Sequence, residues 1–300
     1  MSIQSTDRTH IVIRGVEDPT EQSNIIQFAK DQFNLLLHLA QYRDLIYNLV
    51  VRELKVRYKD SALGILWSLM NPFLMMIVFT IVFTVMAPVA NVDNFPVFLL
   101  CGLLPWNFFT ASLMGSTFSV VGNAGLIKKV YFPREVLPIS IILANLVHFF
   151  IALVVLFGMI FVFRLELTVW ILYLPLVILI HLIFTLGVSL FLAAANVFYR
   201  DTQQIMDVLM LAWFFFTPIF YPIDILPKSY NLFGVTLDVW WLMYILNPMA
   251  SLIANYRIIL YHGSPPALDF LARTMVTALI TFVIGWVVFN RYSWHFAEEL

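Results

Sequence analysis

Long apolar stretches separated by short polar connections make up most of the chain after about residue 63. An α-helix needs about 20 largely apolar residues to cross the roughly 30 Å hydrocarbon layer of a bilayer. Six segments approach or exceed that length: Leu66–Met86, Pro96–Val121, Ile139–Phe163, Val169–Val197, Ile205–Tyr221 and Phe270–Phe289. The pattern predicts an all-α membrane protein with six transmembrane helices within residues 63–290, followed by a short tail of residues 291–300.

The composition indicates the same class of protein. Of the 300 residues, 61% are hydrophobic and 12% are charged, and the mean hydropathy is +0.89. A soluble domain has roughly 45–50% apolar and about 25% charged residues, so these charges are too few to cover a globule in water. The single cysteine, Cys101, excludes an internal disulfide and a multi-cysteine metal site. The net charge of -1 gives no electrostatic indication of a nucleic-acid partner.

The N-terminal segment, residues 1–41, is polar and mixed in charge, without the basic start and apolar core of a signal peptide. We therefore expect the first spanning helix to act as its own insertion signal. The distribution of Lys and Arg gives the orientation, because cytoplasmic connections are enriched in these residues. With a cytoplasmic N-terminus, 13 of the 17 lie inside, and Arg164, Lys228, Arg257 and Arg273 lie outside. Six crossings then place both termini in the cytoplasm.

Residues 42–62, just before the first span, show helical periodicity. The apolar positions at that spacing are Leu45, Ile46, Leu49, Val50 and Leu54, and the basic positions are Arg52, Lys55, Arg57 and Lys59. Arg52, Lys55 and Lys59 share a face, although Arg57 interrupts a clean stripe. The pattern predicts an amphipathic helix in the cytoplasmic interface. A soluble surface helix is the alternative, and the nearness of the first span disfavours it.

The cytoplasmic connection of residues 123–138 carries basic side chains and two prolines, Pro133 and Pro138, that limit helix continuation. It either anchors the topology through its charges or docks a cytoplasmic partner. The outer connection, residues 222–268, is too apolar for a solvated loop. Its two apolar runs, Trp240–Leu246 and Ala250–Tyr261, are too short to span and flank Asn247-Pro248, which favours a break. We predict two re-entrant or interfacial helices there.

Motifs for energy coupling and catalysis are absent from the sequence. No G-x-x-x-x-G-K-[ST] phosphate loop occurs, and neither do H-E-x-x-H, C-x-x-C or G-x-S-x-G. We therefore do not expect this chain to bind ATP by that route or to be an enzyme. Coupled transporters place titratable groups inside the bilayer, and the mid-span candidates here are His148 and His181. A lone histidine of this kind is more often a packing residue than a proton relay, so an ion-driven transporter is disfavoured.

Aromatic residues make up 16% of the chain, and most are expected to face lipid, helix contacts or the membrane interface. Some can line a transport pathway, because sugar rings stack their C–H faces on aromatic rings. The candidates lie where aromatics cluster in two of the predicted spans: Trp106, Phe108, Phe109, Trp213, Phe214, Phe215 and Phe216. The sequence leaves open whether each faces a pathway or lipid.

Several short motifs succeed one another between Ile11 and Asn290. They are Arg52-Glu53-Leu54-Lys55-Val56-Arg57-Tyr58-Lys59, Leu63-Gly64-Ile65-Leu66-Trp67, Asn71-Pro72, Gly102-Leu103-Leu104-Pro105-Trp106, Leu126-Ile127-Lys128-Lys129-Val130-Tyr131-Phe132-Pro133-Arg134, Phe198-Tyr199-Arg200-Asp201, Thr217-Pro218-Ile219, Asn247-Pro248-Met249 and Tyr256-Arg257. In this order and spacing they resemble the membrane subunits of type-2 ABC exporters. The resemblance is to the branch that exports O-antigen, capsular polysaccharide and teichoic acid.

The resemblance implies a homodimeric permease that exports a lipid-linked polysaccharide across the bacterial inner membrane. Two copies of a separate ABC ATPase would hold ATP and Mg, with no cofactor or metal in this chain. Residues 42–60 would lie beside the ATPase, and residues 123–138 would insert into it. The implied coupling residues are Lys128, Lys129, Tyr131, Phe132, Arg134 and Glu135, and the implied outer-gate residues are Trp240, Trp241, Asn247 and Pro248.

Three other functions are weighed against this one. Within the family, the chain can instead export a drug, a lipid or another small amphiphile. A membrane-embedded glycosyl or acyl transferase needs acids, histidines or lysines converging near an interface, and the sequence has no such cluster. A purely structural membrane scaffold has no evident need for the basic connection of residues 123–138.

Overall fold

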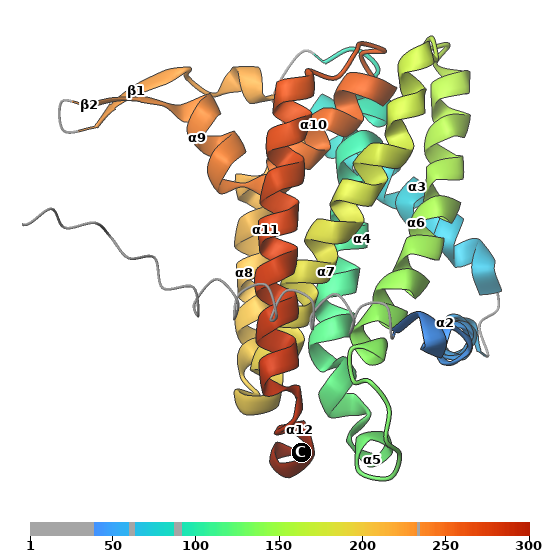
Figure 1. The fold of residues 1–300 in the computed structure, drawn as a ribbon. Helices are drawn as coiled ribbons and strands as arrows, with labels where there is room; N and C mark the ends of the chain where they lie inside the picture. The colour runs from blue at the N-terminus through green and yellow to red at the C-terminus, as the bar shows by residue number, and fades with distance from the viewer. Residues whose placement is uncertain (1–38, 60–63, 87–91, 233–234) are drawn as a thin grey trace, which may run out of the picture. The chain divides into compact units, whose positions relative to one another are not determined.

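The computed structural model describes residues 39–59, 64–86, 92–232 and 235–300 (Figure 1). The chain divides into two units, Met1–Tyr42 and Arg43–Leu300. In the first, the described residues are Leu39 and a short 3-10 turn, η1 (Ala40–Tyr42), so most of the predicted N-terminal segment lies outside the described residues. The second unit contains the other described helices and strands.

Five of the described helical segments are long and apolar enough to cross a membrane. They are α3 (Trp67–Thr80) with its π-helical extension η3 (Ile81–Met86), α4 (Phe95–Gly122), α6 (Val136–Val162), η4 (Val169–Tyr173) continuing into α7 (Leu174–Phe198), and α11 (Leu268–Ser293). Each coincides with a segment predicted from the apolar pattern. The chain is therefore a mainly helical protein with several spans.

The segment predicted as the fifth span is shorter than expected. Its helix, α8 (Thr202–Phe216), has 15 residues, which corresponds to about 22 Å at 1.5 Å per residue. The helix ends because Thr217 adopts an extended backbone with φ −100° and ψ 132° in front of Pro218. A residue before proline avoids the helical region, and proline has no N–H to continue the ladder.

The remaining elements are short and cluster at the ends of the long helices (Figure 1). They are α2 (Arg43–Tyr58), η2 (Gly64–Leu66), α5 (Ala124–Ile127), η5 (Ile223–Ile225), β1 (Ser229–Leu232), β2 (Val235–Asp238), α9 (Val239–Leu246), α10 (Pro248–Leu260) and α12 (Phe296–Glu299). The antiparallel pair β1–β2, with Ser229 opposite Asp238, corrects the all-α expectation for this stretch. Tyr, Val and Thr are common in strands, and here they form a two-stranded ribbon.

Helix α4 is the centre of the packing and contacts α3, α6, α7, α8 and α10. In its most apolar stretch 78% of the residues are buried, against 11% for α3. Helices α7 and α11 approach most closely at two glycines. A Cβ atom on Gly285 would lie 1.9 Å from the carbonyl oxygen of Gly187, so a side chain at Gly285 would force the two backbones apart. This pair fixes α11 against the bundle.

Candidate functional site

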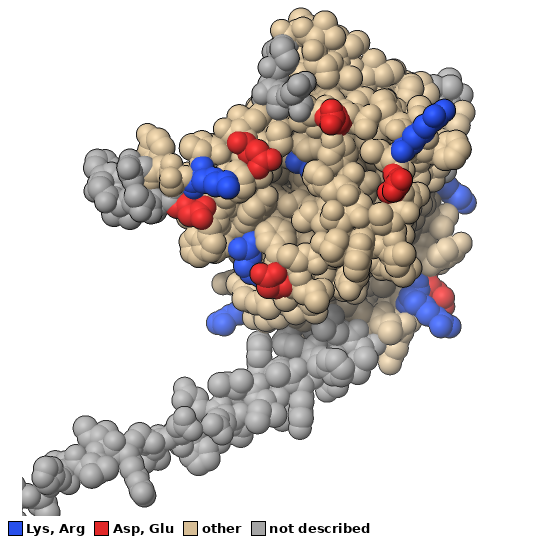
Figure 2. All heavy atoms as spheres, turned by 90° about the horizontal axis from the view of Figure 1, so that it is seen from above, with Lys and Arg blue, Asp and Glu red and all other residues tan. Residues whose placement is uncertain are grey.

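The short elements define two opposite ends of the bundle (Figure 1). At one end lie α5 and α12, and at the other lie α10 and the strands β1 and β2. Seen from above in Figure 2, the end with α10 is mostly uncharged, and its basic and acidic side chains are scattered rather than gathered in one patch. The two ends hold the predicted coupling and outer-gate residues, respectively.

Helix α2 forms in the segment for which an amphipathic helix is predicted. Leu45, Leu49 and Leu54 are buried or half-buried on the helix that packs on α6, whereas Tyr47 and Val56 are exposed, as are Arg52, Lys55 and Arg57. In Figure 1 it is seen nearly end-on, so it runs across the direction of the long helices. A guanidinium N–H of Arg52 donates to Glu53 at 2.8 Å and to Asn123 Oδ1 at 3.4 Å. Since Asn123 opens the predicted coupling segment, this bond connects the interface helix to that segment.

The coupling segment forms one helical turn, α5, followed by extended residues that lead into α6. Its basic side chains Lys128 and Lys129 are exposed, and Tyr131 is 84% exposed. A hollow of about 230 Å³ is formed by Ile127 to Phe132 together with Arg134. The segment therefore presents cations and an aromatic ring around a shallow concave surface.

Two of the predicted coupling residues are directed into the chain itself. Phe132 is 8% exposed and Glu135 is 4% exposed. Burial raises the pKa of the Glu135 carboxyl above its ordinary value, although a backbone hydrogen bond and the nearby Arg134 act in the opposite direction. The Phe132 ring is buried inside this chain and offers little surface to a partner, and its coupling role stays a prediction. Tyr131, its neighbour, is the exposed aromatic of this segment.

At the opposite end, Asn247 joins three elements. Its Oδ1 accepts from the backbone N–H of Ala250 at 3.2 Å, which caps α10, and from Trp213 Nε1 at 2.8 Å. Its Nδ2 donates to Thr217 Oγ1 at 2.9 Å. The predicted break at Asn247-Pro248 therefore separates α9 from α10. The hydrogen bonds of the Asn247 side chain connect this break to the end of α8. Trp241 of α9 is exposed, and the indole of Trp240 donates to the Leu226 carbonyl at 3.0 Å.

Arg257 is a buried cation on α10 that entered the sequence-based prediction through the charge count and the Tyr256-Arg257 motif, without a structural role. Its guanidinium donates to the carbonyl oxygens of Pro218 and Ile219, both at 2.5 Å, and lies 3.6 Å from the centre of the Phe98 ring. Within the described chain its hydrogen-bond partners are backbone carbonyls rather than a carboxylate. These bonds provide donors for two carbonyls of the non-helical segment that follows α8. An arginine inside an apolar run was the available signal for this role.

The predicted pathway aromatics separate into two groups. Trp106, Phe108 and Phe109 of α4 are buried, and Phe109 stacks on Phe184 of α7 with ring centres 5.5 Å apart. Trp106 and Phe109 therefore pack in the core of this chain, and their place in a pathway stays a prediction. On α8, Trp213 and Phe214 are half-buried, whereas Phe215 and Phe216 are exposed.

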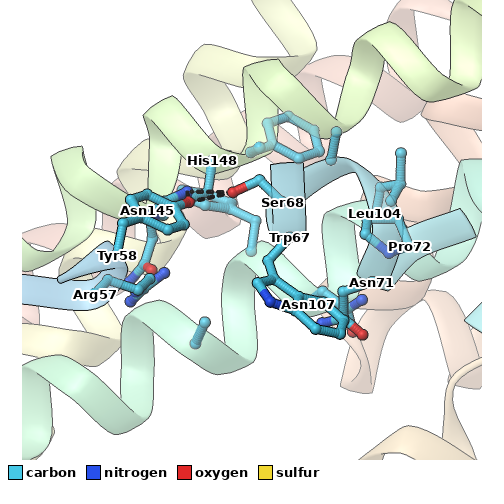
Figure 3. A pocket seen from close by; sticks show the side chains of 14 residues that line it. Arg57, Tyr58, Trp67, Ser68, Asn71, Pro72, Leu104, Asn107, Asn145 and His148 are labelled. Carbon is cyan, nitrogen blue, oxygen red and sulfur yellow. Dashed lines mark hydrogen bonds between the residues drawn. The ribbon is translucent and has the colours of Figure 1, made fainter. Parts of the chain in front are cut away.

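A cavity of about 340 Å³ lies between α2, α3, α4 and α6, and the sequence motifs did not predict it (Figure 3). On one side, His148 Nδ1 lies 2.6 Å from the Tyr58 hydroxyl and 3.0 Å from Ser68 Oγ, and the two hydroxyls also bond to each other. These contacts join α6, α2 and α3. The other mid-span histidine, His181, is fully buried, with Nδ1 3.3 Å from the Tyr256 hydroxyl.

The chain is similar in sequence to known transport proteins over most of its length. The sequence model of the family described as ABC-2 type transporter matches residues 44–261. The chain is 37% identical to the O-antigen export system permease protein RfbA of Myxococcus xanthus, over 89% of this chain and 99% of that protein. It is 34% identical to the protein of the same name from Klebsiella pneumoniae, over 88% and 97%. It is 26% identical to the polysialic acid transport protein KpsM of Escherichia coli, over 77% and 88%.

Proposed function

Since the chain belongs to the ABC-2 type transporter family, we propose that it is the permease subunit of an exporter for a lipid-linked, O-antigen-like polysaccharide. A separate ATPase subunit would bind ATP and Mg and supply the driving force. The observation that carries the proposal is the full-length similarity to O-antigen export permeases, which covers 97–99% of those relatives. The more distant relatives are named for transport of another polysaccharide, polysialic acid.

The geometry of the coupling end supports a role in receiving motion from a partner. Lys128, Lys129 and Tyr131 extend outward from a short rigid turn, and Arg52 links that turn to α2. A partner that displaces the turn would therefore move α2 and the start of α6 with it. Packed elements of this kind change between discrete arrangements rather than deform continuously.

The assembly we propose is a homodimer with two ATPase chains at the end that carries α5. Helices α3 and α8 leave long apolar faces exposed, including Leu74, Val78, Val208, Leu211 and Phe215. In a single chain these faces have no protein partner among the described residues, and a second copy would cover part of them. A pathway between two protomers can be wide enough for a polymer, whereas one closely packed bundle leaves no such space.

The membrane topology we propose has six crossings with both termini in the cytoplasm of the inner membrane. Helix α8 together with residues 217–221 would make the fifth crossing, and α9 and α10 would enter the outer leaflet and turn back. The buried network around Asn247 and Arg257 supports this, because irregular backbone at membrane depth has to be satisfied by protein.

Deletion and complementation in the native host test the function. We expect loss of the chain to remove surface polysaccharide while lipid-linked polymer accumulates in the cytoplasm, and the restored gene to reverse both. Purified alone, the chain should hydrolyse no ATP, and with its ATPase it should isolate as two copies of each. Unchanged surface polysaccharide after deletion would exclude the proposal. If the deleted strain instead became sensitive to a toxic amphiphile, the small-molecule exporter would be the better account.

Accessibility labelling tests the topology. In a Cys101→Ser background, Ser264→Cys should react with an impermeant thiol reagent added to intact cells, because Ser264 lies at the end with α10. Glu299→Cys should react only after the cells are opened, because α12 lies at the end that would face the cytoplasm. Both native side chains are exposed, so a missing reaction reports sidedness rather than burial. The reverse pattern would invert the orientation.

A further inference from the structure

The cavity between α2, α3, α4 and α6 contains a polar group that the described chain leaves without a partner. Asn145 of α6 lines the cavity and is 2% exposed, and neither its Oδ1 nor its Nδ2 has a hydrogen-bond partner among the described residues. A buried amide without partners costs free energy, so such groups in native proteins nearly always bind something. An amide offers both donors and an acceptor to that occupant.

Other polar side chains around the cavity add further hydrogen-bond donors and acceptors to those of Asn145. Figure 3 shows Tyr58, Ser68 and His148 bonded together on one side, and Trp67, Asn71 and Asn107 gathered on the other. The walls between them are apolar or aromatic and include Phe108 and Phe149. Its volume of about 340 Å³ falls within the roughly 300–1,000 Å³ of small-ligand pockets. The cavity combines amides and hydroxyls with flat rings.

The charges around the cavity decide between a neutral and an ionic occupant. None of the described lining residues is acidic, and Arg57, the one cationic side chain among them, is exposed at the mouth. A phosphate held at the level of Asn145 would be a buried charge without a counter-ion, which is costly. A polyhydroxylated neutral ring fits instead, because each hydroxyl both donates and accepts and the C–H faces of the ring pack on aromatic walls.

We propose that this cavity binds one pyranose ring of a glycan carried on a membrane lipid, with the ring hydroxyls on Asn145 and the ring face against Phe108 and Phe149. The anionic link between sugar and lipid would then lie at the mouth beside Arg57. Trp67 of α3 lines the cavity and is also exposed, and other exposed apolar side chains of α3, such as Met70, would offer a surface for the lipid chain. This inference rests on the proposed function and names the part of the substrate that each protomer recognises.

Native mass spectrometry of the full-length chain in nanodiscs tests the site. The probes are polyprenyl phosphates carrying one glucose or one N-acetylglucosamine, with sugar-free polyprenyl phosphate and phosphatidylglycerol for comparison. We expect at least one sugar-bearing lipid to bind about tenfold more tightly than the sugar-free lipid, as roughly two net hydrogen bonds provide. Asn145→Leu should reduce its binding to the sugar-free level. Asn290→Leu is the matched control, since its amide nitrogen is also buried without a partner and lies on α11, outside the cavity.

The variant is designed so that misfolding does not imitate loss of binding. Leucine has a side chain of similar length to asparagine and needs no hydrogen bonds, so Asn145→Leu should unfold at the same temperature as the wild type or higher. Equal binding of sugar-bearing and sugar-free lipid, equal competition by phosphatidylglycerol, or unchanged binding by folded Asn145→Leu would each overturn the inference. If the chain still restores surface polysaccharide, any of these results would overturn only the binding site and leave the proposed function standing. Failed complementation would instead exclude the proposed function, on which the binding site rests.

Discussion

The two ends of the bundle are built in opposite ways. At the end with α10, polar side chains are buried and bonded within the chain: Arg257 holds the carbonyls after α8, and Asn247 joins α8 to α10. At the end with α5, the basic side chains Lys128 and Lys129 are exposed. Its long-range side-chain bonds include Arg52 to Asn123 and Ser116 to the Pro138 carbonyl. One end is held by its own buried polar contacts, and the other leaves basic side chains exposed where the proposed ATPase would bind.

This difference shows how the same residue types carry different roles. A buried arginine bonded to carbonyls determines the local fold, because its removal leaves several polar groups unsatisfied. Exposed lysines such as Lys128 contribute little to stability and are available for recognition. Substitutions at the α10 end should therefore act on folding, and those at the α5 end should act on partner binding.

The largest effect is expected at Arg257. Arg257→Leu leaves the carbonyls of Pro218 and Ile219 buried without donors, so we expect destabilisation on the order of 3–5 kcal/mol. The measurements are the yield of monodisperse protein in detergent and the unfolding temperature. The unfolding temperature of Arg257→Lys should lie between those of the wild type and Arg257→Leu, because one ammonium group does not reproduce the planar guanidinium. A wild-type unfolding temperature for Arg257→Leu would mean that these bonds do not hold the α10 end.

A smaller effect at the same end is expected for Asn247→Ala. The substitution removes the cap of α10 and leaves the Trp213 indole N–H without its acceptor, which together should cost about 2–3 kcal/mol. Thermal unfolding of the purified chain measures this loss of stability. Trp241→Ala is the control on the adjoining helix, because its ring is exposed and its loss should change stability by less than about 0.5 kcal/mol. Equal shifts for the two variants would contradict the role of Asn247.

The long helices were predictable because their signal is local. Apolar runs of the required length set α3, α4, α6, α7 and α11 within a few residues, and Asn247-Pro248 marked the break between α9 and α10. Helix α8 ended early because Thr217 and Pro218 stop the ladder inside an apolar run that hydropathy alone continues to Tyr221. The strands β1 and β2 were missed because their pairing is short and lies inside a stretch that was assigned by its apolar character.

Which side chains face a partner could not be read from hydropathy, since burial depends on neighbours distant in the sequence. Tyr131 and Phe132 are adjacent aromatics, and only the fold directs one outward and the other inward. The same reason explains why the sequence did not place Trp106 and Phe109 in the core of the chain. The cavity around Asn145 could not be predicted from the sequence either, because its lining comes from four helices that the tertiary structure brings together.

At the α5 end the pair Tyr131 and Phe132 separates recognition from folding. Tyr131→Ala should weaken binding of the ATPase by about 2 kcal/mol, roughly thirtyfold, with an unchanged unfolding temperature. Phe132→Ala should lower the unfolding temperature, and its folded fraction should bind the ATPase normally. Lys128→Ala, an exposed charge, should weaken binding by about 0–1 kcal/mol. Co-purification titrations measure all three, and weaker binding by Phe132→Ala than by Tyr131→Ala would reverse the assignment.

The smallest effect concerns Glu135, the one acidic side chain that the coupling segment buries. Its pKa is raised by burial, so between the ordinary glutamate value of 4.5 and the raised value the folded chain holds a proton that the unfolded chain has lost. Stability therefore falls as pH rises through that window, so Glu135 favours the fold less at neutral pH than at acidic pH. Glu135→Gln keeps the shape without the charge and should unfold at a higher temperature than the wild type at pH 7.

The difference between Glu135→Gln and the wild type should shrink as the pH falls and vanish below the ordinary glutamate value, where both states of the wild type are protonated. Glu299→Gln, an exposed carboxylate near the C-terminus, provides the matched control and should show little difference at any pH. Unfolding temperatures of the three proteins from pH 4 to pH 7 measure this. A wild type that is more stable than Glu135→Gln at pH 7 would contradict the raised pKa, because it would mean that the folded chain stabilises the ionised carboxylate.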